Sequence, residues 1–417
     1  MVADPISDVL IAGGSHVGLA LALSLDRLLG RDVRITVVER HRPSSPPAHP
    51  RDPRAFAIAA ASKTLLDAIG VWPAIAAHAQ PVSAIDITDS ALEHAIRPVL
   101  LSYDNATSSG DPATWIVPAP ELHAALYAAV ATKANIAVLT GEIARIDTGS
   151  ARATVELTDG RSVSGHLLVA ADGRHSIVRD AAGIGTVGWS WEQVGIVATV
   201  RHGRPHAGRA VQHFLPGGPF AILPLVGDRS CITWSETADE GRRLVAESDQ
   251  TFLDETERRF GHRLGTLELD GPRALWPLEH HMARALVARR LALVGDAARS
   301  VHPIAGQGLN LALRDVAALA ETVADTMRVG LDAGDATGLE RYERWRRFDA
   351  TMSAAVFGGL NTLFSNDWTM LRAARGAGLG IVDRLPALKQ AFVAEAAGLT
   401  GDVPRLMQQP HAQSALS

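Results

Sequence analysis

Residues 11–18 read IAGGSHVG and place small residues at the spacing of a dinucleotide-binding turn. Gly13, Ser15 and Gly18 stand where the pattern G-x-G-x-x-G has its three glycines. The first glycine permits a tight turn after a strand, the second lets a pyrophosphate approach the backbone, and the third lets helix and strand pack closely. Ser15 weakens the second role alone, since serine is small and its hydroxyl can reach a phosphate oxygen. By itself the stretch is balanced between a nucleotide site and a glycine-rich turn.

An acidic residue follows at the distance that a nucleotide site requires. Glu39 ends the β-branched run VRITVVE, 21 positions after Gly18. A carboxylate about 20 residues beyond the turn binds ribose hydroxyl groups in dinucleotide-binding folds. A solvated carboxylate at a strand end is the alternative for Glu39 taken alone. Strand, turn, helix, strand and carboxylate together favour the nucleotide site.

A second segment, LALVGDAARSVHPIAGQGLNLALRD, joins a strand-end carboxylate to a helix start. Asp296 follows a buried run and suits a sugar hydroxyl. The free N–H groups of the first helical turn, at Gly308, Leu309 and Asn310, suit the electron-rich edge of a flavin. Loop shaping by the glycines and capping by Asp296 are the alternatives.

A third strand end lies in VAADGRHSIVR, where Asp172 and Gly173 precede residues at helical spacing. A capped helix start with a surface arginine is the alternative here. Three strand-end turns of this kind in one chain favour a shared ligand.

The composition of the 417 residues excludes several classes of protein. The length suffices for roughly two or three domains, and 47% hydrophobic with 20% charged residues is typical of a globular protein. A net charge of −5 argues against nucleic acid as a partner. Cys231 is the only cysteine, which excludes an intramolecular disulfide and a cysteine-based metal site and favours a reducing, cytoplasmic location. We expect neither a signal peptide, because Asp4 and Asp8 precede the first apolar run, nor a membrane span, because no apolar run is long enough, which leaves peripheral membrane contact.

The periodicity of apolar residues predicts an α/β frame with a sheet-rich insertion. A β-α-β unit spans residues 8–39, and five prolines in 41–54 mark a loop. Helices are predicted over 62–79, with Ser62 as N-cap, and over 120–133, and a hairpin turns at Asp159-Gly160. We expect three parts: an α/β domain over 1–82, 115–182 and 284–335, a sheet-rich domain over 83–114 and 183–283, and a helical C-terminal segment over 336–417.

These stretches, with DPRAFAIAAASKTLLDAIGVW, GPFAILPL and the C-terminal LERYERWRRFD…LNTLFSND, resemble the single-component FAD-dependent aromatic hydroxylases, and within them the ubiquinone-biosynthesis hydroxylases. The resemblance covers nearly the whole chain in order. It implies a p-hydroxybenzoate-hydroxylase-like fold, in which a Rossmann-like FAD-binding domain carries an inserted mixed or antiparallel sheet that holds the substrate. Ala119 and Ala312 depart from the family pattern, the first in place of a polar residue and the second in place of glycine.

The resemblance also implies which residues contact FAD. The turn at Gly13 would face the pyrophosphate, Glu39 the adenosine ribose, Arg54 the phosphates or the flavin side, and Asp296 the ribityl chain. The family has no second nucleotide fold, so Asp172 would serve both FAD and transient NAD(P)H contact. The full set of implied cofactor residues is Gly13, Ser15, Val17, Gly18, Glu39, Arg40, Arg54, Asp172, Asp296, Pro303, Gly306, Gly308, Leu309 and Asn310.

In the chemistry that the resemblance implies, NAD(P)H reduces FAD, the reduced flavin adds O2 at C4a, and the hydroperoxide attacks an electron-rich phenol ring. No catalytic triad or metal site is expected. His302 is a candidate for polarising substrate or peroxide, with a loop histidine bonded to backbone as the alternative. The ring-side candidates, for which plain core is the alternative, are Trp191, Phe220, Leu223, Pro224 and Trp234.

The implied substrate is a lipid-like prenylated phenol of ubiquinone biosynthesis. The amphipathic stretch 371–399 is a candidate to cover a prenyl tail or touch the inner membrane, with an ordinary packing helix as the alternative. Three other functions stay open: a hydroxylase of soluble aromatic or polyketide substrates, a non-catalytic FAD-binding subunit of a biosynthetic complex, and a flavin-dependent reductase. Association with other ubiquinone-biosynthesis proteins and homo-oligomer formation also stay open.

Overall fold

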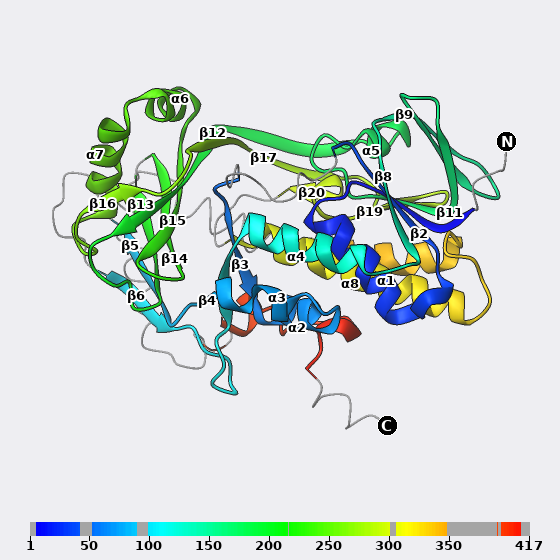
Figure 1. Cartoon of the computed structure of the whole chain (residues 1–417), viewed down its shortest axis with the longest axis horizontal. Helices are drawn as coiled ribbons and strands as arrows, with labels where there is room; N and C mark the ends of the chain where they lie inside the picture. The colour runs from blue at the N-terminus through cyan, green and yellow to red at the C-terminus, as the bar shows by residue number, and fades with distance from the viewer. Residues whose placement is uncertain are drawn as a thin grey trace.

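The computed structural model describes residues 6–41, 52–89, 99–215, 217–300, 306–347, 390 and 393–409. Figure 1 shows two lobes, one built on a parallel sheet with long helices and the other on a larger sheet capped by two short helices. The strands β12 (Thr186–His202) and β17 (Ala274–Ala283) extend from one lobe to the other. The described residues contain no helix that is both long and apolar enough to cross a membrane.

The first lobe contains the parallel sheet that the sequence predicts. Its strands lie in the order β18-β19-β11-β1-β2-β8, and all neighbours in this order pair in parallel except β18 with β19, which are antiparallel. Val9, Leu10 and Ile11 are completely buried, as expected for a strand covered on both faces. The bounds are β1 Ser7–Ala12, β2 Ile35–Glu39, β8 Ile136–Thr140, β11 Ser162–Ala170, β18 Val287–Ala288 and β19 Leu291–Leu293.

Helices α1 (His16–Leu29), α4 (Ala119–Ala131) and α8 (Gly308–Arg328) pack together in this lobe (Figure 1). Gly30 ends α1 with a φ of +74°, and Pro120 lies in the first turn of α4. A 3-10 helix, Gly30–Asp32, follows α1. Helix α5 (Ile177–Ala181) is short and begins after Ser176, whose hydroxyl accepts from the Arg179 N–H at 3.0 Å.

An antiparallel hairpin extends the parallel sheet. Strand β10 (Ala153–Leu157) pairs with β11 and with β9 (Ile143–Thr148). The turn between β10 and β11 contains Gly160 at a φ of +86°, which confirms the hairpin predicted at Asp159-Gly160.

The second lobe is a nine-stranded sheet in the order β20-β17-β12-β15-β14-β13-β5-β6, with β16 beside β12. Its pairs are antiparallel except β13 with β5, so the predicted mixed sheet is confirmed. The helices α6 (Ala238–Ala246) and α7 (Asp249–Phe260) cover one of its faces. The remaining bounds are β5 Ala84–Asp89, β6 Val99–Asp104, β13 Arg209–Leu215, β14 Gly218–Leu225, β15 Arg229–Thr237, β16 Leu267–Leu269 and β20 Arg299–Ser300.

A three-stranded sheet of β3 (Ala55–Ala59), β7 (Thr114–Pro118) and β4 (Gln80–Pro81) packs against the other face of the large sheet. The helix predicted over 62–79 is wrong in its bounds. Helix α2 is Ala60–Ala68, and Gly70, at a φ of +76°, separates it from α3 (Trp72–Ile75) and the 3-10 helix Ala76–His78. Ser62 is therefore a buried residue inside α2 rather than its N-cap.

The predicted three-part division stays a prediction, although the strands follow it closely. β20 is the exception, because it lies within 284–335 but pairs with β17 of the large sheet. The C-terminal part continues with helical residues 336–347 and a 3-10 helix, Arg405–Met407. Most of the proline loop and of the stretch 371–399 lies outside the described residues.

Candidate functional site

The turn between β1 and α1 accepts no side chain at two of its glycines. Gly13 has a φ of +106°, and a Cβ atom there would lie 2.3 Å from the carbonyl oxygen of Ala171. A Cβ atom on Gly18 would lie 1.9 Å from the carbonyl oxygen of Gly13. The backbones of β1, α1 and β11 thus approach more closely than any larger residue allows, and the first N–H groups of α1 are left at an open turn.

Glu39 lies beside this turn. The Gly14 N–H donates to Glu39 Oε2, and the His41 N–H lies 3.4 Å from Oε1. The carboxylate is half-buried and keeps further lone pairs for a hydroxyl donor. Arg40 points elsewhere, since its exposed guanidinium lies 3.5 Å from Glu142.

His16, the fourth residue of the turn, is a functional candidate that the sequence reasoning missed. Its Nε2 lies 2.9 Å from the Ala119 carbonyl oxygen and its Nδ1 lies 3.2 Å from Ser15 Oγ. Burial lowers the pKa of His16 to about 4, so the ring is neutral near pH 7. The one signal in the sequence is a histidine at the first position of a predicted helix, on the side that faces the protein core.

Asp172 lies directly against the glycine turn. A Cβ atom on Gly13 would lie 3.0 Å from the Asp172 Cα, so the first and third predicted segments meet. Asp172 Oδ2 accepts from the Val178 N–H at 3.3 Å, whereas Oδ1 is buried without a hydrogen-bond partner among the described residues. Burial raises the pKa of this carboxyl above its usual value. A buried carboxylate oxygen without a protein partner is an acceptor open to a donor from a ligand or from a bound water.

Asp296 lies in the 3-10 helix Gly295–Ala297 that follows β19. A Cβ atom on Gly295 would lie 3.3 Å from Val17 and from Ala312, which brings the second segment against the start of α1. The Asp296 side chain is accessible to solvent, yet many protein atoms surround it. This partial removal from water raises the pKa of its carboxyl, although the nearby Arg174 and Arg54 act to lower it.

Two side chains hold the backbone at Asp296 and Ala297. His281 Nε2 donates to the Asp296 carbonyl oxygen at 2.9 Å. The Arg179 guanidinium donates to the carbonyl oxygens of Arg174, at 3.0 Å, and Ala297, at 3.3 Å. The loop after Asp172 and the turn at Asp296 are therefore tied together by one buried arginine.

The start of α8 meets strand β3. Asn310 Oδ1 accepts from the Ala59 N–H at 3.0 Å and its Nδ2 donates to the Ala57 carbonyl oxygen at 2.7 Å. The Asn310 side chain therefore holds β3 in place, and the backbone N–H groups at Gly308 and Leu309 have no acceptor among the described residues. Gly306, at a φ of +63°, lies close to the same strand.

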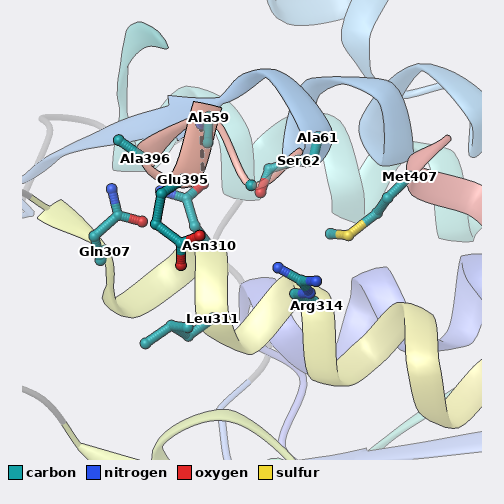
Figure 2. Close-up of a pocket in the computed structure, with 11 residues that line it drawn as sticks. Ala59, Ala61, Ser62, Gln307, Asn310, Leu311, Arg314, Glu395, Ala396 and Met407 are labelled. Carbon is teal, nitrogen blue, oxygen red and sulfur yellow. Dashed lines mark hydrogen bonds between the residues drawn. The ribbon is translucent and has the colours of Figure 1, made fainter. Parts of the chain in front are cut away.

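Figure 2 shows a small pocket on the outer side of this junction, between α2, α8 and the segment 393–409. Gln307, Asn310 and Arg314 approach Glu395 and Met407 across it. It contains none of the carboxylates at the strand ends.

Arg54 precedes β3 and packs on an aromatic residue that the sequence reasoning missed. Its guanidinium forms a two-point hydrogen bond with Asp52 and lies 5.0 Å from the centre of the Trp276 ring. Burial alone would raise the pKa of Asp52, but the hydrogen bonds from Arg54 hold it below its usual value. Trp276 stands on β17, on the sheet face that also carries Leu223.

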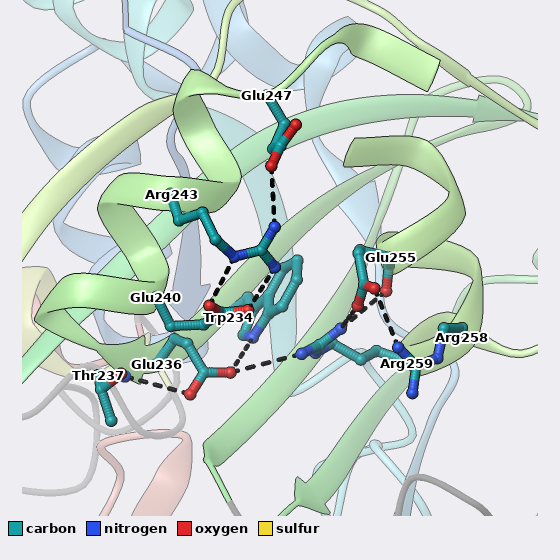
Figure 3. Close-up of polar contacts among 9 residues, drawn as sticks. All are labelled: Trp234, Glu236, Thr237, Glu240, Arg243, Glu247, Glu255, Arg258 and Arg259. Carbon is teal, nitrogen blue, oxygen red and sulfur yellow. Dashed lines mark hydrogen bonds and ion pairs between the residues drawn. The ribbon is translucent and has the colours of Figure 1, made fainter. Parts of the chain in front are cut away.

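The predicted ring-side residues lie on two different faces of the large sheet. Phe220 and Trp234 belong to the buried cluster under α6 and α7, whereas Leu223 packs toward β3 and β7. Figure 3 shows Trp234 between those helices, with the Arg259 guanidinium 4.0 Å from its ring centre and Glu236 accepting from its Nε1. Pro224 is buried, and the side chain of Trp191 lies outside the described part of the structure, as do His302 and Pro303.

A buried ionic cluster supports the turn at Gly295. Asp315 is fully buried, and its Oδ1 accepts from the guanidinium groups of Arg299 and Arg346, the latter at 2.7 Å. Its Oδ2 accepts from the Gly295 N–H at 3.3 Å. Tyr342 donates to the Leu293 carbonyl oxygen at 2.8 Å, one turn before Arg346. No periodic pattern in the sequence indicates this contact between α8 and residues 336–347.

The residues that converge here fit FAD. A glycine cradle for a pyrophosphate, a carboxylate for a ribose, an orphaned oxygen at Asp172 and a helix start for an electron-rich ring edge come from segments far apart in the chain. Among the described residues no cluster of three or more histidine, cysteine, aspartate or glutamate side chains could hold a metal ion.

Acid is expected to destabilise the protein through His16. Folding lowers the pKa of the His16 ring from 6.5 to about 4. The stability that depends on a neutral ring is therefore fully present above pH 6.5 and is lost as the pH falls toward 4. This loss amounts to about 3 kcal/mol of the free energy of unfolding. The free energy of unfolding of the wild type minus that of His16→Gln should fall by this amount from pH 7 to pH 4. Other groups titrate in both proteins and cancel. A difference that stays constant with pH would contradict the expectation.

Comparisons with known proteins agree with this geometry. A family model described as "FAD binding domain" matches residues 7–354. Ubiquinone hydroxylase UbiL of Rhodospirillum rubrum is 41% identical over 414 residues, covering 97% of this chain and 94% of the relative. The 3-demethoxyubiquinol 3-hydroxylase of Escherichia coli is 30% identical over 396 residues, covering 94% and 99%. The crystal structure of a p-nitrophenol 4-monooxygenase from Pseudomonas putida matches with a TM-score of 0.78 at 20% identity, covering 95% and 98%.

Proposed function

Since this chain belongs to the FAD binding domain family, we propose that it is an FAD-dependent monooxygenase that hydroxylates the aromatic ring of a polyprenylated phenol or benzoquinol in ubiquinone biosynthesis. The observation that carries the proposal is the 41% identity to a ubiquinone hydroxylase over 97% of the chain. The resemblance that the motifs predict is confirmed, and the p-hydroxybenzoate-hydroxylase-like fold with it. O2 supplies the oxygen atom and NAD(P)H the reducing equivalents.

The described residues divide the binding of FAD among them. The N–H groups at the start of α1 and the guanidinium of Arg54 hold the pyrophosphate, and Glu39 holds the ribose. Asp296 accepts from the ribityl hydroxyls, and the N–H groups at Gly308 and Leu309 face the pyrimidine edge. When bound, FAD supplies the redox chemistry that activates O2. Asp172 accepts from FAD or from the passing nicotinamide nucleotide through its orphaned oxygen.

The substrate ring lies between the two lobes in this proposal. The sheet face with Leu223 and Trp276 is apolar and packs toward β3, so it excludes water and orients the ring. Cys231 lies fully buried on the same face, and burial raises its pKa to about 12, so it serves as an apolar wall and not as a nucleophile. A prenylated substrate resides in a membrane, so we expect the protein to contact the membrane surface that holds this lipid. We also expect it to bind other proteins of the same pathway.

The decisive assay follows NAD(P)H oxidation and product formation together. FAD-loaded protein is expected to oxidise NAD(P)H faster with a prenylated phenol than without it and to add one oxygen atom to the ring, measured by mass spectrometry under 18O2. Short phenols should be converted less efficiently than prenylated ones, because they lack the tail. Deletion of the gene should cause an under-hydroxylated quinone precursor to accumulate.

Three outcomes would each contradict the proposal in a different way. Coupled turnover with short phenols alone would indicate a hydroxylase of soluble aromatic substrates. Bound FAD with no NAD(P)H oxidation would indicate a non-catalytic subunit. Turnover that continues without O2 would indicate a reductase.

A further inference from the structure

His16 has a defined hydrogen-bond partner at each ring nitrogen, and the partners fix its tautomer. Nε2 lies 2.9 Å from the carbonyl oxygen of Ala119, which can only accept. The neutral ring therefore carries its proton on Nε2, and Nδ1 is an acceptor. The Ser15 hydroxyl, 3.2 Å from Nδ1, must then be the donor in that contact. Its single proton is committed to His16.

The same contacts continue to Arg54. The Ala119 N–H donates to the Arg54 carbonyl oxygen at 2.9 Å. A continuous series of hydrogen bonds thus runs from Ser15 through the His16 ring and the Ala119 residue to Arg54. It connects the first turn of α1 with the backbone of Arg54. Hydrogen bonds in such a series polarise and strengthen one another.

The His16 ring is also packed in place. It is buried, and the rings of Phe56, 5.0 Å away, and His123, 5.4 Å away, meet it edge to face. His123 Nε2 in turn lies 3.3 Å from the Gly14 carbonyl oxygen. Ser15, in contrast, is exposed at the open side of the turn, and its hydroxyl makes no capping bond to the helix.

We propose, building on the FAD-binding function above, that His16 is a positioning residue for the pyrophosphate of FAD. His16 belongs to the first turn of α1, and its Nε2–H bond to Ala119, which itself bonds to the Arg54 carbonyl oxygen, fixes that turn relative to Arg54. The phosphates are bound by the backbone N–H groups of that turn and by Arg54. The Ser15 hydroxyl, whose proton is used by His16, donates nothing to them.

Ser15→Ala tests the role of the hydroxyl without disturbing the buried ring. Its affinity for FAD, measured by quenching of flavin fluorescence on titration of the apoprotein, is expected to stay within about two-fold of the wild type. A hydroxyl that donated to a phosphate would form a charge-assisted bond, and its loss would weaken binding about 10-fold or more. A loss of that size overturns the proposal.

Two substitutions of His16 test the positioning role. His16→Gln places an amide N–H where Nε2 stands and keeps the contact with Ala119, so FAD affinity should stay within about three-fold of the wild type. His16→Leu has a similar volume but no donor, so affinity should fall about 10-fold. Rescue by glutamine separates positioning from packing, because both variants fill the site.

Equal affinities in wild type and His16→Leu, or equal losses in His16→Leu and His16→Gln, overturn the proposal. If His16→Leu does not fold, the Ser15→Ala result still decides between a committed and a free hydroxyl. A wild-type protein that binds no FAD would instead contradict the proposed function, before any variant is compared.

Discussion

Gly18→Ala is expected to lower the affinity for FAD by at least about 100-fold. The added Cβ would lie 1.9 Å from the Gly13 carbonyl oxygen, whereas non-bonded contacts of a real Cβ essentially never fall below 3.0 Å. The partner is backbone, so it cannot rotate away. The start of α1 must instead move by about 1 Å or more, which takes its N–H groups out of reach of the pyrophosphate. Two lost charge-assisted hydrogen bonds of about 1.5–3 kcal/mol each account for the expected change.

Gly185→Ala is the matched control for this substitution. A Cβ atom there would meet the Arg284 side chain at 3.5 Å, an ordinary contact, and Gly185 has no left-handed backbone that alanine would strain. Fluorescence titration should give the wild-type affinity for this control and no saturation with Gly18→Ala at concentrations where the wild type is full. Wild-type affinity in Gly18→Ala would mean that the turn does not hold the pyrophosphate.

The parallel sheet and the glycine turn could be predicted from the sequence because their causes are local. Apolar β-branched runs form the buried strands, and the chain leaves β1 through a residue that must adopt a φ of +106°. The position of Glu39 follows from the spacing of a β-α-β unit. This spacing brings the Glu39 carboxylate to the glycine turn, where it accepts a hydrogen bond from the Gly14 N–H.

Helix α2 shows where local patterns mislead. Ser62 looks like an N-cap, yet α2 begins two residues earlier, because distant acceptors satisfy its first N–H groups. The Ala60 N–H donates to the Ala113 carbonyl oxygen and the Ala61 N–H to that of Ala397, each at 3.0 Å. Such acceptors are separated from α2 by about 50 and 340 residues, so no window of sequence reveals them.

The candidate site likewise contains residues that local sequence patterns predict and residues that only tertiary packing brings together. The carboxylates at strand ends could be found by spacing, whereas the residues that hold them in place could not. His16 depends on Ala119, Trp276 on Arg54, and Asp315 on two arginines, all brought together by packing. The ring-side residues were predicted without knowledge of which sheet face each one occupies, and Trp234 and Leu223 lie on opposite faces.

Asp315→Asn is expected to destabilise the protein by about 3–5 kcal/mol, because it removes the charge shared by two buried arginines while keeping the volume. Asp315 and Arg346 are fully buried and Arg299 nearly so, hence water cannot replace the lost carboxylate. The substitution also weakens the acceptor of the Gly295 N–H, so FAD affinity should fall with stability. Urea unfolding of the apoprotein measures the first effect and fluorescence titration the second.

Asp239→Asn, which alters an ion pair at a 96% exposed aspartate, is the control and should change neither. A loss below about 1 kcal/mol in Asp315→Asn would contradict the expectation, because it would mean that the two buried guanidinium groups are compensated without the Asp315 charge.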